Sequence, residues 1–131
     1  MTRTFNTIAL VPFMLLVLAG CASQSKPAPV GLLDVISRPA ERALQGGLRA
    51  YDDAQYADSE KQLNQALQGG LVSPRDRSAA HKTLAFIYCT SKRMLECEAE
   101  FRAAKGADPT FGLSKSEQGH PLWGPVYKKL Q

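Results

Sequence analysis

The feature that most constrains the fold of this chain is an internal repeat, because the stretch from Gly47 to Leu71 resembles the stretch from Ala85 to Pro109. Within it, Tyr56-Ala57-Asp58-Ser59 aligns with Met94-Leu95-Glu96-Cys97, and small and large residues recur in the same order around this match. The other aligned pairs are Gly47 with Ala85, Leu63 with Phe101, Ala66 with Ala104, and Leu71 with Pro109. Each copy of such a repeat is one supersecondary unit, and neighbouring copies bury their apolar faces by stacking on one another. The repeat therefore predicts two stacked units of the same kind.

Each unit contains two segments with apolar residues at helical spacing. The expected helices cover residues 39–53, 56–68, 73–89 and 93–105. The third has the clearest start, since Ser73 supplies a capping hydroxyl, Pro74 suits the first helical position and Asp76 follows in the first turn. Gly69-Gly70 and Gly106 are expected to end the second and fourth helices. No segment alternates as a strand, so the sequence predicts an all-α fold.

The repeat resembles the tetratricopeptide repeat (TPR), a helix–turn–helix unit of about 34 residues. In the second copy the residues at the family's small and large positions are Leu84, Ala85, Tyr88, Cys97, Phe101 and Ala104, and Asp108-Pro109 gives the typical end. The first copy fits through Gly47, Tyr56 and Ala66, but Ser59 stands where the family has alanine. The resemblance implies an α-solenoid fragment of two TPR-like repeats over residues 39–109.

A stack of two repeats needs cover at its ends, since such stacks generally need about three units. The segment from Phe111 to Tyr127 does not align as a third repeat. We predict an irregular C-terminal cap, in which Trp123, Val126 and Tyr127 fold over the second repeat. The alternative is that this segment is a hook that binds a partner.

The N-terminus has the layout of a secretory signal peptide. Arg3 precedes an apolar run from Ile8 to Ala19, which is too short for a membrane-spanning helix of about 20 residues. The end of this run belongs to the sequence LVLAGC, residues 16–21. Its last four residues, 18–21, resemble the lipobox of bacterial lipoproteins. The resemblance implies cleavage between Gly20 and Cys21 and lipid attachment to the Cys21 thiol.

The expected organisation is a signal peptide over residues 1–20, a lipidated N-terminus and tether over 21–36, and a TPR-like helical domain with its cap over 37–131. Residue 22 is alanine. In Gram-negative lipoproteins an aspartate at this place commonly retains the protein in the inner membrane. The resemblance therefore implies an outer-membrane protein, anchored through Cys21 and facing the periplasm.

Cys89 and Cys97 are the two cysteines left if Cys21 carries lipid. An even pair in an oxidising compartment favours a disulfide, which would join the end of one helix to the start of the next. Cys97 also takes the small buried position of the repeat, where a free thiol packs well. Both states remain open from the sequence, with the disulfide slightly preferred.

Charge and motifs argue against several classes of function. The net charge is +4, but basic and acidic residues are interspersed, so we expect no nucleic-acid partner. His81 and His120 are far apart in the sequence and belong to no array at metal-ligand spacing. The sequence has no nucleophile elbow, P-loop or metal motif. We therefore expect no enzyme activity, catalytic residue, metal, cofactor or small-molecule substrate.

The TPR resemblance implies a partner groove lined by the first helix of each repeat. On this chain the groove residues are Leu44, Leu48, Tyr51, Lys82 and Phe86. A mixed apolar and basic groove suits an extended or helical protein segment. The alternative is that these residues pack against the N-terminal segment or the cap.

The sequence thus predicts a protein–protein interaction adaptor of the cell envelope. Short lipobox-plus-repeat chains with a tail like Gly119–Tyr127 resemble accessory lipoproteins of type VI secretion systems. Two alternatives are a pilotin-like assembly lipoprotein of another envelope machine and a regulator of a cell-wall enzyme.

Overall fold

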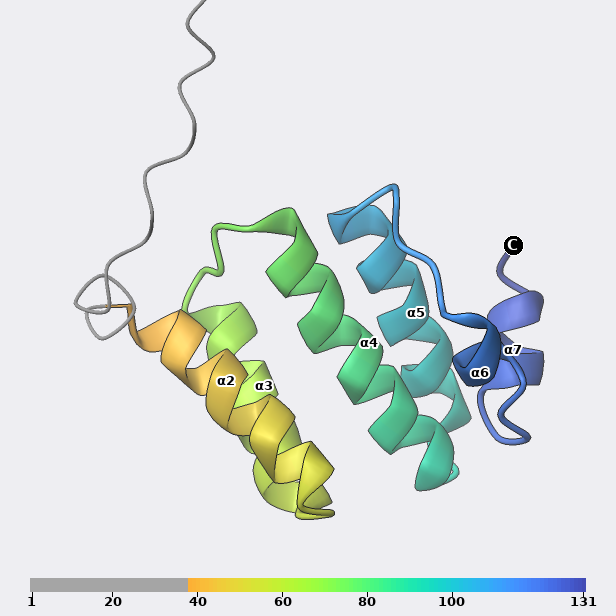
Figure 1. Ribbon diagram of the computed structural model, residues 1–131, viewed down its shortest axis with the longest axis horizontal. Helices are drawn as coiled ribbons and strands as arrows, with labels where there is room; N and C mark the ends of the chain where they lie inside the picture. The colour runs from red at the N-terminus through yellow and green to blue at the C-terminus, as the bar shows by residue number, and fades with distance from the viewer. Residues whose placement is uncertain (1–37) are drawn as a thin grey trace, which may run out of the picture.

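The computed structural model describes residues 38–131, and this part of the chain is helical with no strand. Its helices are α2 (Pro39–Asp52), α3 (Tyr56–Gln68), α4 (Pro74–Thr90), α5 (Met94–Ala107), α6 (Lys115–Gln118) and α7 (Gly124–Lys128). Figure 1 shows α2 and α3 at one end, α4 and α5 in the middle, and the C-terminal segment at the other end. The all-α prediction is confirmed for these residues. The predicted signal peptide, tether and Cys21 lie outside them.

The boundaries of the four long helices follow from local chemistry. The Ser73 hydroxyl accepts a hydrogen bond from the Asp76 amide at 3.2 Å, and Pro74 occupies the first turn of α4, which confirms the predicted start. The expected end of α5 at Gly106 was wrong, because the helix continues through Ala107. It ends where Asp108 takes an extended conformation, as the residue before a proline prefers.

The two hairpins, α2–α3 and α4–α5, turn in the same way. Ala54 and Lys92, which are equivalent in the repeat, both have a left-handed backbone, with φ of 58° and 62°. The next amide in each turn bonds back to a carbonyl of the preceding helix at 2.8 Å, from Gln55 to Ala50 and from Arg93 to Tyr88. The repeat seen in the sequence therefore extends to the backbone geometry of the turns.

This turn geometry predicts that Ala54→Gly stabilises the protein. Ala54 is exposed, and a left-handed conformation costs a residue with a Cβ about 1–2 kcal/mol. Glycine loses more backbone entropy on folding, which offsets part of this gain. We expect the free energy of unfolding to rise by about 0.5–1 kcal/mol in urea denaturation. Ala99→Gly, at an exposed site inside α5, should instead lower it by about 1 kcal/mol; equal effects at both sites would contradict the assignment.

Small residues let the helices of each hairpin approach closely. A Cβ on Gly47 of α2 would lie 2.7 Å from Cγ of Leu63 in α3. The buried Ser59 hydroxyl donates to the Gly47 carbonyl at 2.8 Å and ties the helices together at this point. The second hairpin has Ala85 and Cys97 at the equivalent positions, and both are fully buried. The spacing of small residues in the repeat thus marks where the helices pack.

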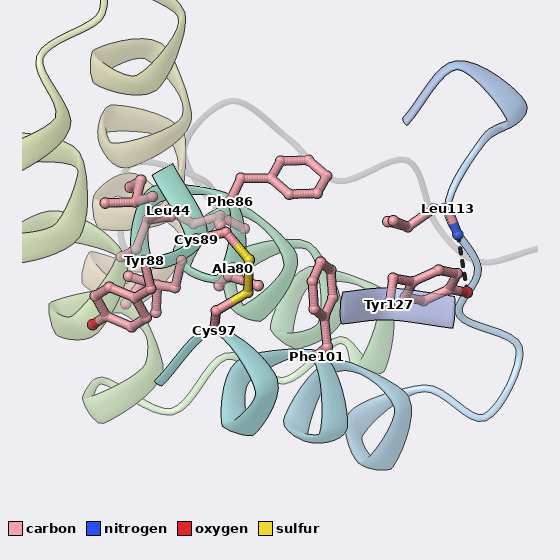
Figure 2. Packing of buried hydrophobic residues seen from close by; sticks show 14 of the residues in the cluster. Leu44, Ala80, Phe86, Tyr88, Cys89, Cys97, Phe101, Leu113 and Tyr127 are labelled. Carbon is pink, nitrogen blue, oxygen red and sulfur yellow. Dashed lines mark hydrogen bonds between the residues drawn. A yellow bond between two sulfur atoms is a disulfide. The ribbon is translucent and has the colours of Figure 1, made fainter. Parts of the chain in front are cut away.

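The core runs through α4, which lies between α3 and α5 (Figure 1). The consecutive residues 83–89 of α4 are all buried, so this helix is covered on all sides. Figure 2 shows Phe86, Tyr88 and Cys89 of α4 packed with Leu44 of α2, Phe101 of α5 and Tyr127 of α7. One apolar cluster therefore joins both hairpins to the C-terminal segment.

The C-terminal cap, residues 111–131, is more regular than the sequence suggested. It contains α6 and α7 instead of irregular chain alone, and α6 begins with a capping box between Ser114 and Glu117. Gly124 starts α7 so close to the Gln118 carbonyl that a Cβ has no room there. Tyr127 is buried, and its hydroxyl accepts a hydrogen bond from the Leu113 amide at 3.2 Å (Figure 2). The two short helices are held by these contacts within the cap, and α7 also packs on α5.

Candidate functional site

The five predicted groove residues lie on one face, formed by α2 and α4. Tyr51 of α2 and Phe86 of α4 bring their ring centroids to 6.4 Å, and Lys82 lies over Phe86 with its Nζ 5.6 Å from the ring centroid. Leu44 and Leu48 lie on the preceding turns of α2. Burial raises the pKa of the Tyr51 hydroxyl, with smaller contributions from Tyr56, Asp52 and Glu117, so this phenol stays neutral at neutral pH.

The cap covers the α4 half of this face. Trp123 stacks on Phe86 with ring centroids 4.3 Å apart, and His120 stacks in turn on Trp123. The Trp123 indole N–H donates to the Glu117 carbonyl at 2.9 Å. Lys82 Nζ donates to Glu117 Oε1 at 2.7 Å. Of the two alternatives that the sequence left for these residues, Lys82 and Phe86 therefore pack against the cap, and Phe86 is only 5% exposed.

The contact between Lys82 and Glu117 predicts that acid loosens the cap. Burial raises the pKa of the Glu117 carboxyl, but hydrogen bonds from Lys82 and Ser114 outweigh it and hold the pKa below its usual value of 4.5. A lowered pKa in the folded state means that this stabilisation is complete above 4.5 and is lost as the pH falls through the folded-state pKa. We expect the near-ultraviolet circular dichroism of the cap aromatics to weaken below about pH 4.5.

Two variants separate this effect from general acid unfolding. Glu117→Gln should remove the cap transition, whereas Glu98→Gln, at a carboxylate that pairs with Arg102 on α5, should leave it in place. Identical pH profiles for the wild type and Glu117→Gln would contradict the role of Glu117.

Within residues 38–131, no segment covers the α2 half of the face. This half contains a hollow of about 460 Å³, which we call the α2–α4 hollow. Its apolar lining consists of Leu44, Leu48 and Val72. Its charged lining residues are Arg38, Glu41 and Asp76. Val72 is 74% exposed, which is high for a large aliphatic side chain beside other apolar groups. Sequence reasoning missed Val72, because it lies in the connection between α3 and α4 and belongs to no helical pattern. The hollow joins apolar surface to charges of both signs, as small recognition sites often do.

Cys89 and Cys97 form a disulfide that closes the α4–α5 turn. Their Cα atoms lie 5.2 Å apart, and both residues are almost fully buried (Figure 2). Arg93, at the turn itself, lies over the Tyr88 ring at 4.1 Å and forms an ion pair with Glu60 of α3 at 2.9 Å. The disulfide and this ion pair fix the second hairpin internally and against the first.

The two histidines have structural partners. His81 Nδ1 lies 2.6 Å from Glu100 Oε2 and links α4 to α5. His120 Nδ1 accepts a hydrogen bond from the Leu122 amide at 3.3 Å. Over residues 38–131 no three histidine, cysteine, aspartate or glutamate side chains gather as metal ligands do. Within the same range no helix has the length and apolar character needed to cross a bilayer.

Within residues 38–131, the cap therefore covers one half of this face, and the half at the α2–α4 hollow is uncovered. Comparison of the chain with protein-family models, with curated proteins and with solved structures finds no match.

Proposed function

We propose that this chain is a lipid-anchored protein of the cell envelope whose helical domain binds a partner protein through the α2–α4 hollow. The observation that carries the proposal is the apolar lining of Leu44, Leu48 and the strongly exposed Val72 beside charged residues. A hollow of this shape takes one or two apolar side chains of a protein segment, while Arg38, Glu41 and Asp76 meet the polar groups beside them. The cap leaves this half of the face free.

The anchoring part of the proposal rests on the LVLAGC sequence at residues 16–21. Two or more acyl chains at Cys21 would hold the protein stably, since each buried methylene contributes about 0.8 kcal/mol. A Cys21→Ser variant should be released from membranes into the soluble envelope fraction and should incorporate no labelled palmitate. A variant that stays with membranes after removal of peripheral proteins would contradict the lipid anchor.

We further propose that the two hairpins are TPR-like repeats and that the protein is an accessory component of a secretion system of the type VI kind. The turn geometry shared by Ala54 and Lys92 and the small residues at each helix crossing support the first part. The second part is supported by the resemblance of the tail at Gly119–Tyr127 and by the order of lipobox, tether and repeats.

Site-specific photo-crosslinking in cells tests the binding site. A photoreactive residue in place of the exposed Gln45, which lines the hollow, should crosslink one protein, and Val72→Glu should abolish the product. Leu95→Glu is the matched control, because Leu95 is also a strongly exposed aliphatic residue, at 84%, but does not line the hollow. Loss of crosslinking in both variants, or in neither, would contradict the site.

The identity of the crosslinked protein tests the assignment to a secretion system. A secretion-system component would support the proposal. A peptidoglycan enzyme would replace it with regulation of cell-wall synthesis, and a component of another assembly would replace it with a pilotin-like role.

A further inference from the structure

A second hollow, of about 430 Å³, lies between α5 and the cap; we call it the α5–α7 hollow. Aromatic side chains line it: Phe101 and Tyr127 have ring centroids 5.4 Å apart, and Phe111 meets Tyr127 edge-to-face at 6.0 Å. Arg102 and Lys105 of α5 line it beside them. This hollow shares no lining residue with the α2–α4 hollow.

The internal repeat explains why this surface is open. On the first hairpin, α4 packs along α3 as a helix of 17 residues. On the second hairpin, the cap supplies α6 and α7, of 4 and 5 residues, so within the described part of the chain no helix of comparable length covers α5. Leu67 of α3 packs against the core, but its repeat equivalent in α5 is the exposed Lys105. The hollow therefore lies where a further helix would continue the stack.

The charges around this hollow indicate the kind of helix that fits. Arg102 pairs with Glu98 of its own helix at 3.3 Å and is 65% exposed. Lys105 has no salt bridge within residues 38–131 and is also exposed. Lys128 and Lys129, next to Tyr127 in the chain, are exposed as well. These cationic side chains lie in or next to the lining of the hollow, beside its apolar residues, and this charge favours an acidic ligand.

We propose that the α5–α7 hollow docks an acidic amphipathic helix of a partner protein. Its apolar side chains, spaced three and four residues apart, contact Phe111 and Leu130, the half-buried apolar residues of the lining, and its carboxylates meet Arg102 and Lys105. α5 has 14 residues and is therefore about 21 Å long, which matches a partner helix of three to four turns. With the α2–α4 hollow at its other end, the domain then has two binding surfaces.

A displayed library of helical peptides about as long as α5, with varied apolar and flanking positions, tests the proposal on the full-length chain carrying Cys21→Ser. We expect the selected peptides to carry Asp or Glu beside an apolar stripe. Lys105→Glu and Arg102→Glu should each weaken their binding at least tenfold. Lys61→Glu, an exposed lysine on α3, is the matched control and should leave binding unchanged.

A charge swap provides the decisive comparison. Peptides in which Lys replaces the selected Glu should lose binding to the wild type and regain it with Lys105→Glu. Selected peptides without acids, or binding that survives both Arg102→Glu and Lys105→Glu, would overturn the proposal. Self-association of the chain that Lys105→Glu abolishes would also overturn it, by making a second copy the occupant.

This test is independent of the function proposed above. Val72→Glu, which alters the α2–α4 hollow, should leave peptide binding at the α5–α7 hollow intact. Failure at one hollow therefore does not decide the outcome at the other.

Discussion

Replacing Cys89 and Cys97 together with alanine lowers the free energy of unfolding by about 2–3 kcal/mol. The disulfide joins residues 8 positions apart, and closing even a short loop removes conformational entropy from the unfolded chain. Both side chains are buried, so the loss of two sulfur atoms also removes packing contacts. Urea denaturation followed by circular dichroism measures the effect, and a reducing agent should destabilise the wild type but not the variant.

The first hairpin provides a control for the loss of packing. Ser59 is the repeat equivalent of Cys97, and its hydroxyl donates to the Gly47 carbonyl. Ala85 is the equivalent of Gly47, so the hydroxyl of a Cys97→Ser variant can donate to the Ala85 carbonyl in the same way. Cys89→Ala with Cys97→Ser should therefore be at least as stable as the double alanine variant. Two thiols that can be alkylated in the native, oxidised protein would contradict the disulfide.

Trp123→Ala detaches the cap and lowers the free energy of unfolding by about 2–3 kcal/mol. The variant loses the stack on Phe86, which is then exposed to water, and the hydrogen bond from the indole to the Glu117 carbonyl. Amide hydrogen exchange should increase across the cap, while α2 and α3 keep their protection. This pattern distinguishes local detachment of the cap from loss of the whole fold.

Trp123→Phe separates the two contributions of the indole. The variant keeps an aromatic ring against Phe86 but loses the N–H donor, so we expect a loss of about 1 kcal/mol. Leu122→Ala, at an adjacent residue that is 46% exposed, should have little effect. Equal stability of the wild type and Trp123→Ala would show that the cap does not stabilise the domain.

The long helices could be predicted from the sequence because their signals are local. Ser73-Pro74 marks the start of α4, and apolar spacing places the other three within about two residues of their observed bounds. α6 and α7 were missed because helices this short depend on tertiary contacts. One signal for α6 was present, however, since Ser114 and Glu117 have the spacing of a capping box.

The candidate site could be predicted only in part, because its contacts join distant residues. The TPR resemblance placed Tyr51 and Phe86 on one face, and their rings do lie close together. No local pattern indicates that Trp123 covers Phe86, that Lys82 meets Glu117, or that His81 pairs with Glu100. The partners in each pair belong to different helices or to the cap, and they become neighbours only once α4 and α5 pair and the cap folds onto α4.

The only tryptophan of the chain lies in the cap, stacked on His120 as well as on Phe86. Fluorescence excited at the indole band therefore reports on this one segment without any label. A ligand that displaces the cap should shift the emission to longer wavelength, because the indole moves into water. A ligand that fills the α2–α4 hollow and leaves the cap in place should leave the emission unchanged. The domain thus carries an intrinsic optical reporter of whether partner binding opens the cap.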